Sequence, residues 1–371
     1  MKLKIIFLLS NFRAGGAETQ FANLIKNIDR NKFEPVLGLI KYKNNTPTPE
    51  FLAQFGDIEI IEFRRKRRLD FMVVFRIRSF ILKRGINIIQ SQLFMDNQIA
   101  RFSGLFSGRP VVTSVRGEIG AILSKSKMWF EFKSQFLSCK IVVNSKWLKD
   151  YVVNLGSHAE KIVCIYNGVD FLRYQCEEKK IKLREIYNID SDAPVISIVA
   201  RLHPMKDHIT FLKTISILKK SYPDIVALIV GDGDEKEFLK QYVSEIGIES
   251  NVRFLGVIGD KLAEIYKITD VLLLTSQWGE SFPNVILEAM SVSVPVVASN
   301  ISAVPEIIDN GVNGFIVEKN NAEQFSNKIL TLLSDSELSN TLIPKAREKV
   351  RSFDIPAMVK AYELLYESIC S

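Results

Sequence analysis

The sequence predicts an α/β protein with two doubly wound parallel sheets. Apolar runs of strand length alternate with amphipathic segments of helix length through both halves of the chain. The alternation pauses near residue 170 and then resumes, and 371 residues exceed what one hydrophobic core usually serves. We therefore expect two Rossmann-like domains that face each other across a cleft, because ligands of such sheets bind beyond the carboxyl ends of the strands.

The first domain is predicted to span residues 1–172. Its strands are the runs LKIIFLL, INIIQS, PVVTSV and KIVVNS, and each is followed by a helical pattern. The charged stretch QCEEKKIKLREIYNIDSDAP then has the composition of a linker.

The second domain is predicted to span residues 190–350. Its strands are the runs VISIVA, IVALIV, VRFLG, VLLLTS, PVVAS and GFIV. Between the first two lies a helix with Phe211, Leu212, Ile215 and Leu218 on one face. The chain ends in one more amphipathic helix, MVKAYELLYESI.

The composition is that of a soluble globular protein, with 47% apolar and 25% charged residues. No apolar run approaches the length of a membrane helix, and the run Ile5 to Leu9 is too short for the core of a signal peptide. The four cysteines form no C-x-x-C pair, which favours the cytoplasm.

The charge is divided unequally. Residues 1–172 carry 27 Lys and Arg against 14 Asp and Glu, whereas residues 173–371 carry 22 against 28. The first half also contains a basic run, formed by Arg64, Arg65, Lys66, Arg67 and Arg68. The run is either a solvated loop or a site for an anionic membrane surface, at which the protein would be peripheral. Nucleic acid is disfavoured as a partner, because no nucleic-acid-binding motif accompanies the run.

Two segments at predicted strand ends are suited to anionic ligands. Gly15 and Gly16 allow close backbone approach at a helix start, although a plain turn explains them equally well. Arg201 and Lys206, in ARLHPMKD, are suited to a diphosphate, or are two surface cations. His203 lies between them and is not expected to be catalytic.

The turn GDGD contains Gly231, Asp232, Gly233 and Asp234. Its carboxylates could hold Mg²⁺ with a substrate phosphate, but a tight turn with a helix-capping aspartate explains them as well.

Glu280 and Glu288 stand eight residues apart in ESFPNVILE. Proline is tolerated best in the first turn of a helix, so the helix is expected to start near Phe282 or Pro283. Glu280 then lies in the loop and Glu288 inside the helix, with the first-turn amides around Phe282 to Asn284 placed to receive an anion. The alternative is two unrelated carboxylates.

Taken together, these segments resemble the retaining glycosyltransferases of the large group 1 family, over nearly the whole chain. The most specific part is the E-x₇-E segment in SQWGESFPNVILEAMSVSVPVVASN. GGAE, IYNGVD, ARLHPMKD, VGDGDEKEFL and RFLGVIGDKLAEIYKITDVLLLTS occur in the family's order. The resemblance implies the GT-B architecture, in which the last helix, from about Ile355, crosses back onto the first domain.

The resemblance also implies a role for each matching residue. Arg201 and Lys206 would hold the donor diphosphate, Glu280 would lie near the donor sugar, and Glu288 would bind the nucleotide ribose. Further donor contacts are implied for Gly15, Gly16, Gly231, Asp232, Gly233, Ser281, Phe282, Pro283 and Asn284. No essential metal or other cofactor is expected. The acceptor is expected to be a saccharide or a lipid-linked compound.

The sequence departs from the family pattern where a histidine usually follows the strand PVVTSV. This chain has Arg116-Gly117-Glu118, so the role of the histidine near the donor sugar is either vacant or has passed to Arg116. Arginine cannot serve as a base at ordinary pH, but it can hold an anionic or hydroxylated group. Ser281 replaces the glycine of the usual Glu-Gly-Phe. Because of these departures, a second hypothesis is a protein that binds a nucleotide sugar without turnover. A third is a sugar-nucleotide epimerase with a similar two-domain plan. A nicotinamide oxidoreductase is disfavoured, because neither domain carries an intact fingerprint.

Overall fold

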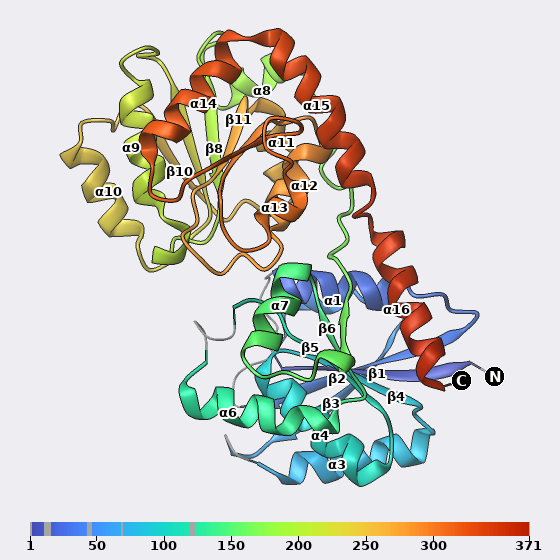
Figure 1. Ribbon diagram of the computed structural model, residues 1–371. Coiled ribbons are helices and arrows are strands. Elements are labelled where there is room, and N and C mark those ends of the chain that lie inside the picture. Colours follow the sequence, from blue (N-terminus) through green and yellow to red (C-terminus); the bar gives the residue numbers. More distant parts are fainter. Residues whose placement is uncertain (1, 11–15, 43–46, 68–69, 119–122, 371) are drawn as a thin grey trace. The chain divides into compact units, whose positions relative to one another are not determined.

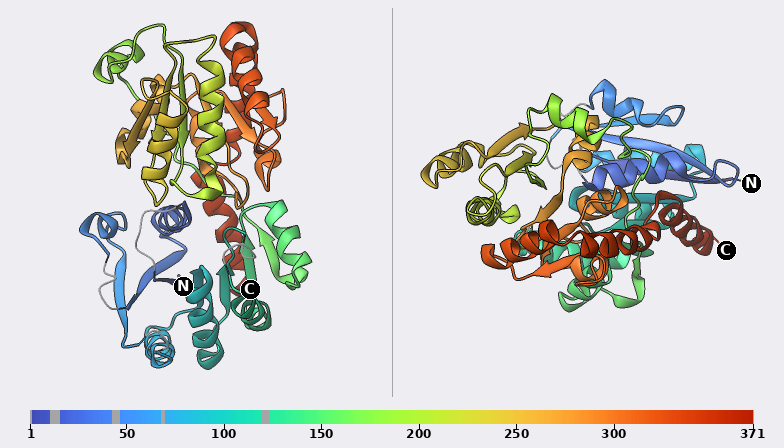
Figure 2. Two further views of the ribbon diagram at one scale, coloured as in Figure 1. Left: turned by 90° about the vertical axis from the view of Figure 1, so that its left-hand side faces the viewer. Right: turned by 90° about the horizontal axis from the view of Figure 1, so that it is seen from above.

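The computed structural model describes residues 2–10, 16–42, 47–67, 70–118 and 123–370 (Figure 1). Gly15 and Arg68, both named above, lie outside these ranges. The chain divides into two compact units, the first made of Met1–Gly168 with Ile355–Ser371 and the second of Val169–Asp354. Each unit contains one parallel sheet with helices on both faces (Figure 2). The predicted fold class is confirmed.

The first unit has a seven-stranded sheet in the order β3-β2-β1-β4-β5-β6-β7, in which every neighbouring pair is parallel. The order reverses direction between β1 and β4, the switch point at which doubly wound sheets form ligand crevices. The strands are β1 (Leu3–Leu9), β2 (Phe33–Tyr42), β3 (Glu59–Arg65), β4 (Ile88–Gln92), β5 (Val111–Ser114), β6 (Lys140–Val143) and β7 (Ile162–Cys164).

Helices cover this sheet because successive strand residues alternate between its faces. In β1, Ile5, Phe7 and Leu9 belong to one core, whereas Ile6 and Leu8 belong to a second. The helices are α1 (Gly16–Asn27), α2 (Pro49–Ala53), α3 (Met72–Arg84), α4 (Phe94–Ser107), α6 (Lys125–Ser134), α7 (Lys146–Asn154) and α16 (Ile355–Cys370), with short 3₁₀ turns η1 (Gln135–Leu137) and η2 (Ala159–Lys161).

The carboxyl-terminal helix α16 packs within the first unit, against α1. Glu363 accepts a hydrogen bond from the amide of Asp29 at 2.8 Å, and the hydroxyl of Tyr366 donates to Gln90 of β4 at 3.2 Å. The ring of Tyr366 meets Phe7 edge to face, with centroids 6.5 Å apart. The last residues of the chain therefore complete the core of its first half.

The second unit has a six-stranded sheet in the order β10-β9-β8-β11-β12-β13, again parallel throughout. The strands are β8 (Val195–Val199), β9 (Val226–Val230), β10 (Val252–Gly256), β11 (Val271–Leu274), β12 (Val296–Ser299) and β13 (Phe315–Val317). The helices are α8 (Lys180–Ile186), α9 (His208–Leu218), α10 (Lys236–Glu245), α11 (Leu262–Ile268), α12 (Asn284–Ser291), α13 (Val304–Ile307), α14 (Ala322–Ser334) and α15 (Ser336–Arg351), with 3₁₀ turns η3 (Pro204–Lys206) and η4 (Gly259–Lys261).

The boundary between the units lies earlier than residue 172. The second unit begins at Val169, and the stretch expected to be a linker forms α8. Leu183 of α8 is buried in a core with Val195 of β8 and Ile265 of α11. The high charge of the stretch concealed this one apolar side.

Gly104 marks the closest approach of α4 to the sheet. A Cβ atom at this position would lie 2.1 Å from Cγ2 of Val111 and 2.9 Å from the carbonyl oxygen of Arg109. We expect Gly104→Ala to lower the free energy of unfolding by about 1–3 kcal/mol, because the overlap outweighs the helix propensity gained. Urea unfolding measures this. Leu105→Ala, at an exposed neighbour in α4, is the control, and an equal loss in the control would contradict the packing argument.

Candidate functional site

The residues proposed to hold the donor gather at one edge of the second sheet. The loop with Arg201 and Lys206 follows β8, the turn Gly231–Gly233 follows β9, and Glu280 follows β11. Because β9 and β11 are the two neighbours of β8, these segments leave adjacent strands at their carboxyl ends. This is the edge at which parallel sheets bind ligands.

Two glycines allow the turn after β9 to contact the loop after β8. A Cβ atom on Gly231, whose φ is +136°, would lie 1.9 Å from the carbonyl oxygen of Ala200. One on Gly233 would lie 2.2 Å from the carbonyl oxygen of Leu202, whose amide donates to the carbonyl of Asp232 at 3.1 Å. The two segments thus form one backbone platform that excludes side chains.

The ammonium group of Lys206 forms an ion pair with Oε1 of Glu280. Only 17% of the lysine side chain and 8% of the glutamate side chain are exposed. Ser276 donates its hydroxyl to the same carboxylate oxygen at 2.6 Å. Lys206 and Glu280, which were predicted to bind different parts of the donor, are therefore in direct contact. The hydroxyl of Ser276 helps to hold them.

Arg201 is held much less tightly. Its side chain is 65% exposed, and its guanidinium lies 3.8 Å from Asp234. Asp232 lies 3.6 Å from Lys236 and accepts a hydrogen bond from the amide of Gly233 at 2.8 Å. Within the part of the chain that the structure describes, no group of three or more His, Cys, Asp and Glu residues could hold a metal ion.

Glu288 lies more than one turn inside α12, whereas Glu280 lies eight residues earlier. The helix begins at Asn284 with Pro283 as its N-cap, so Glu280 is in the loop as the proline predicted. Phe282 is buried against Phe353, with ring centroids 5.2 Å apart. The loop is thereby anchored at the start of the helix.

Two tyrosines hold the carboxylate of Glu288. Tyr266 of α11 donates its hydroxyl to Oε2 at 2.8 Å, and Tyr174 also forms a hydrogen bond with the carboxylate. The rings of the two tyrosines meet edge to face at 5.7 Å. Burial raises the pKa of Glu288, while the two hydrogen bonds act in the opposite direction. Sequence reasoning missed both tyrosines, because Tyr174 lies in no motif and nothing in the segment that contains Tyr266 marks it as a partner of Glu288.

Arg116 of the first unit has two side-chain partners. Its Nη1 donates to Oδ1 of Asn167 at 2.7 Å, and its Nη2 donates to the hydroxyl of Tyr362 in α16 at 2.9 Å. The guanidinium follows β5 and is held in place by segments from two distant parts of the sequence. Gly16 is the first residue of α1, which follows β1.

Asp96 is a buried carboxyl that the sequence did not single out. It lies in the first turn of α4, is fully buried, and accepts a hydrogen bond from the amide of Ser10 at 3.1 Å. Burial raises the pKa of Asp96 to about 7, Ser10 and Arg65 lower it, and Glu18 raises it further. A single aspartate in the segment FMDNQIAR carries no signal that would have identified it.

His203 and His208 belong to the segment that follows β8. His203 accepts a hydrogen bond from the amide of Met205 through Nδ1 at 3.2 Å, as a turn residue would. Burial lowers the pKa of His208 to about 4, which keeps its imidazole neutral.

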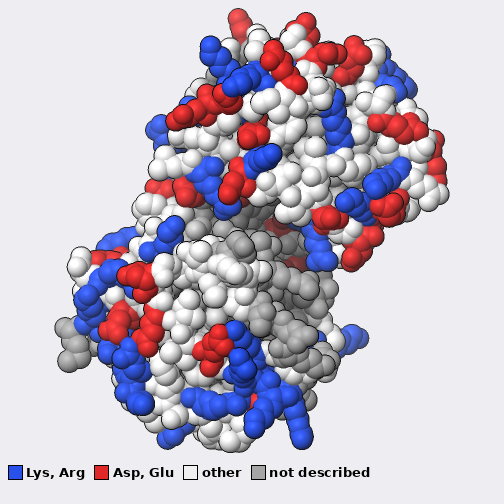
Figure 3. Space-filling model, turned by 180° about the vertical axis from the view of Figure 1, so that it is seen from behind, with Lys and Arg blue, Asp and Glu red and all other residues white. Residues whose placement is uncertain are grey.

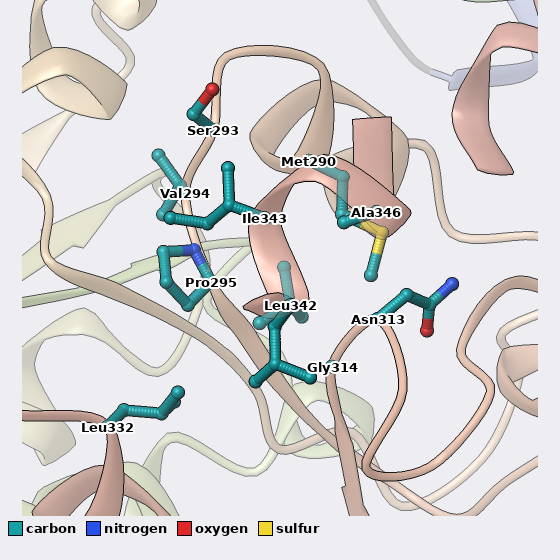
Figure 4. A pocket seen from close by; sticks show the side chains of 11 residues that line it. Met290, Ser293, Val294, Pro295, Asn313, Gly314, Leu332, Leu342, Ile343 and Ala346 are labelled. Atoms are coloured by element: carbon teal, nitrogen blue, oxygen red, sulfur yellow. The ribbon is translucent and has the colours of Figure 1, made fainter. Parts of the chain in front are cut away.

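A hollow at the opposite edge of this sheet is too small for a ligand. Figure 4 shows it where α12 ends and β12 begins, with Met290, Val294, Leu342 and Ala346 among the side chains that line it. It has no room for even a water-sized molecule. It also lies at the amino end of β12, whereas the residues described above lie at carboxyl ends.

The two parallel sheets with interleaved helices agree with the GT-B fold. Residues 14–173 match the family model described as Glycosyltransferase Family 4, and residues 179–349 match the model described as Glycosyl transferases group 1. With the fold, the two matches support a group 1 glycosyltransferase.

Curated relatives resemble parts of the chain. An uncharacterized glycosyltransferase of Methanocaldococcus jannaschii is 31% identical over 238 residues, which cover 61% of this chain and 59% of that protein. The Escherichia coli UDP-Gal:alpha-D-GlcNAc-diphosphoundecaprenol alpha-1,3-galactosyltransferase is 32% identical over 211 residues, covering 56% and 54%. The chain thus spans little more than half the length of these relatives.

Solved structures resemble the whole chain. HepE from Anabaena in complex with UDP has a TM-score of 0.87 at 23% identity, covering 99% of this chain and 100% of that chain. A glycosyltransferase from Rickettsia africae has a TM-score of 0.86 at 22% identity, covering 100% and 99%. At 23% and 22% sequence identity, these similarities establish the fold alone.

The pair formed by Lys206 and Glu280 should be energetically coupled. Lys206→Met and Glu280→Gln each leave a partly buried partner without its ion pair, so we expect each to cost about 1–3 kcal/mol of unfolding free energy. The double variant should be destabilised by less than the sum of the two single variants, with a difference of at least about 1 kcal/mol. The exposed pair of Arg30 and Asp57, 3.4 Å apart, is the control and should show coupling below about 0.5 kcal/mol. Equal coupling in both cycles would contradict a special role for the buried pair.

Asp96 should make stability depend on pH. Its folded pKa lies above the ordinary value of 3.8, so the folded chain binds more protons than the unfolded chain between pH 4 and 7. The stability contributed by the protonated carboxyl is therefore lost as pH rises through about 7. We expect Asp96→Asn to gain up to about 4 kcal/mol relative to the wild type between pH 4 and 8.

Unfolding free energies of both proteins across this range measure the gain. Asp57→Asn, at a carboxylate whose side chain is 96% exposed, is the control. A difference between wild type and Asp96→Asn that does not change with pH would show that Asp96 is ionised throughout.

Proposed function

We propose that the protein transfers a sugar, with retention of configuration, from a nucleoside diphosphate sugar to a hydroxyl of a saccharide or lipid-linked acceptor. The observation that carries the proposal is the placement of two carboxylates around the start of α12. Glu280 pairs with Lys206 before the helix, and Glu288 is held by two tyrosines inside it. Both belong to residues 179–349, which match the group 1 model.

In the proposed reaction the acceptor oxygen bonds to the anomeric carbon as the bond to the leaving phosphate oxygen breaks. The acceptor proton passes to that phosphate, so no protein base is required. Negative charge grows on the leaving diphosphate, and cations held in place are the strongest source of stabilisation for it. Arg201 and Lys206 are the cations on the adjoining loop, so the proposal includes no metal.

Each remaining residue then has a distinct part. Glu280 would accept hydrogen bonds from donor-sugar hydroxyls while it orients Lys206, and Glu288 would hold the ribose. Arg116, fixed by Asn167 and Tyr362, would bind a hydroxylated or anionic group. The similar Escherichia coli galactosyltransferase, which acts with UDP-Gal on a diphosphoundecaprenol-linked sugar, supports donor and acceptor classes of this kind.

The activity is tested by screening nucleotide sugars for thermal stabilisation and then assaying nucleoside diphosphate release with acceptor. A ligand at 100 times its dissociation constant stabilises by about 2.7 kcal/mol. The anomeric configuration of the product, read by NMR, tests retention. Undiminished rates in EDTA are expected, whereas metal-dependent turnover would contradict the metal-free mechanism.

Two glutamate variants should separate binding from chemistry. Glu288→Gln should raise KM for the donor about 10-fold with kcat nearly unchanged, because it loses ribose binding common to ground and transition states. Glu280→Gln should lower kcat about 100-fold or more, because it disturbs the group that orients Lys206. Lys240→Ala, on the exposed side of α10, is the control.

Full donor binding without transfer to any acceptor would instead indicate a binding protein. Interconversion of a free nucleotide sugar would indicate an epimerase.

A further inference from the structure

The first unit contains an apolar pocket that no donor residue lines. It has a volume of about 720 Å³ and lies between α3, α4 and α6. Its apolar lining includes Phe71, Val74, Met95, Ile99, Phe102 and Phe130. The volume is in the range of small-molecule sites, and such sites are mostly apolar with a few polar groups.

The pocket lies at the functional edge of its sheet. Lining residues lie at or near the starts of α3, α4 and α6, and Arg65, the last residue of β3, completes them. Helix starts follow the carboxyl ends of parallel strands. The pocket is therefore on the edge at which ligands of doubly wound sheets bind.

Five aromatic side chains form an unbroken row, and three of them, Phe71, Phe102 and Phe130, line the pocket. The ring centroids of Phe106 and Phe75 are 5.2 Å apart, those of Phe75 and Phe71 5.9 Å, those of Phe71 and Phe102 5.7 Å, and those of Phe102 and Phe130 6.3 Å. Phe71 is 51% exposed and Phe130 is 38% exposed. Exposed apolar surface that continues into a pocket is typical of a binding site for an apolar ligand.

Charge around the pocket favours an anion. Arg65 and Lys127 line it, and its one acidic lining residue, Asp70, is paired with Arg76 at 2.7 Å. The basic residues Arg64, Lys66 and Arg67 adjoin Arg65. Figure 3 shows Lys and Arg side chains gathered over the end of this unit where Figure 1 places α3 and α4.

We propose that this pocket receives the hydrocarbon chain of a phosphate-bearing lipid acceptor, with Arg65 and Lys127 at the phosphate. The inference rests on the proposed function and narrows its acceptor to the lipid-linked class. A saccharide alone would leave the apolar row uncovered, and a bilayer surface would not fill the pocket. Apolar walls and cationic groups in one pocket fit a ligand that has a chain and a charged head.

Isothermal titration with farnesyl phosphate below its micelle concentration tests the pocket. We expect binding of farnesyl phosphate, binding at least about 10-fold weaker for farnesol, and none for inorganic phosphate. Phe130→Asp should weaken binding at least about 10-fold, because it places a charge in the apolar wall. Ser126→Trp, at an exposed lining position, should do the same by filling the space.

Neighbours in the same helix provide matched controls. Trp129→Asp changes a residue that is 62% exposed and lines no part of the pocket, and it should change the affinity less than about twofold. Lys127→Glu should weaken binding of the phosphate form more than Lys125→Glu, which lies outside the lining. Equal losses with Trp129→Asp and Phe130→Asp would indicate adsorption to an apolar surface and overturn the proposal. Absence of farnesyl phosphate binding would also overturn it.

A second readout separates this inference from the proposed function. Thermal stabilisation by the nucleoside diphosphate that stabilises the wild type reports on the donor unit and should be unchanged in Phe130→Asp, which also shows that the variant folds. Transfer to a short-chain lipid-linked sugar should fall with Phe130→Asp, whereas release of nucleoside diphosphate to water should persist. Binding of farnesyl phosphate without turnover of any nucleotide sugar would overturn the acceptor role and the proposed function, but would leave the lipid site.

Discussion

The ion pair of Lys206 and Glu280 holds together the loops that follow two neighbouring strands. The hydroxyl of Thr275 donates to the carbonyls of Lys206 and Asp207, each at 2.9 Å, and the amide of Gln277 donates to Met205 at 2.9 Å. Gly279 has a φ of +82°, and a Cβ there would lie 2.4 Å from the sulfur of Met205. The ion pair and the hydrogen bonds of Thr275 and Gln277 therefore join the loops, and Gly279 allows their close contact. The start of α12 is positioned with them.

The two units present different chemistry at equivalent edges of their sheets. At the second sheet, polar groups in fixed positions surround a helix start, an arrangement suited to a small, charged, hydrogen-bonding donor. At the first sheet, a pocket of aromatic and aliphatic side chains is bordered by cations. The uneven charge of the two halves of the sequence agrees with this division. Two copies of one fold type thus supply two unlike surfaces, because the fold determines where loops gather and not what they carry.

Much of the plan follows from local patterns in the sequence. Apolar runs of strand length predicted all six strands of the second sheet but only four of the seven in the first, since β2, β3 and β7 were not identified. The strand–helix alternation predicted that the sheets would be parallel. Pro283 predicted correctly that Glu280 precedes a helix that contains Glu288. The charged stretch after residue 174 misled, because Leu183 and Arg184 of α8 are both buried, and Arg184 pairs with Asp270 at 2.9 Å. The tyrosines on Glu288 were missed, because nothing in the sequence connects Tyr174 or Tyr266 with that glutamate.

By itself, the sequence determined which residues stand at strand ends, since strand length, helix period and proline position are local properties. Only the tertiary structure decided which of those residues meet. Lys206 and Glu280 are 74 positions apart, and Arg116 and Tyr362 are 246 positions apart. The pocket of the first unit is likewise made by three helices from separate parts of the sequence, which the strand order brings together. Such partners depend on strand order and side-chain packing, which no single segment encodes.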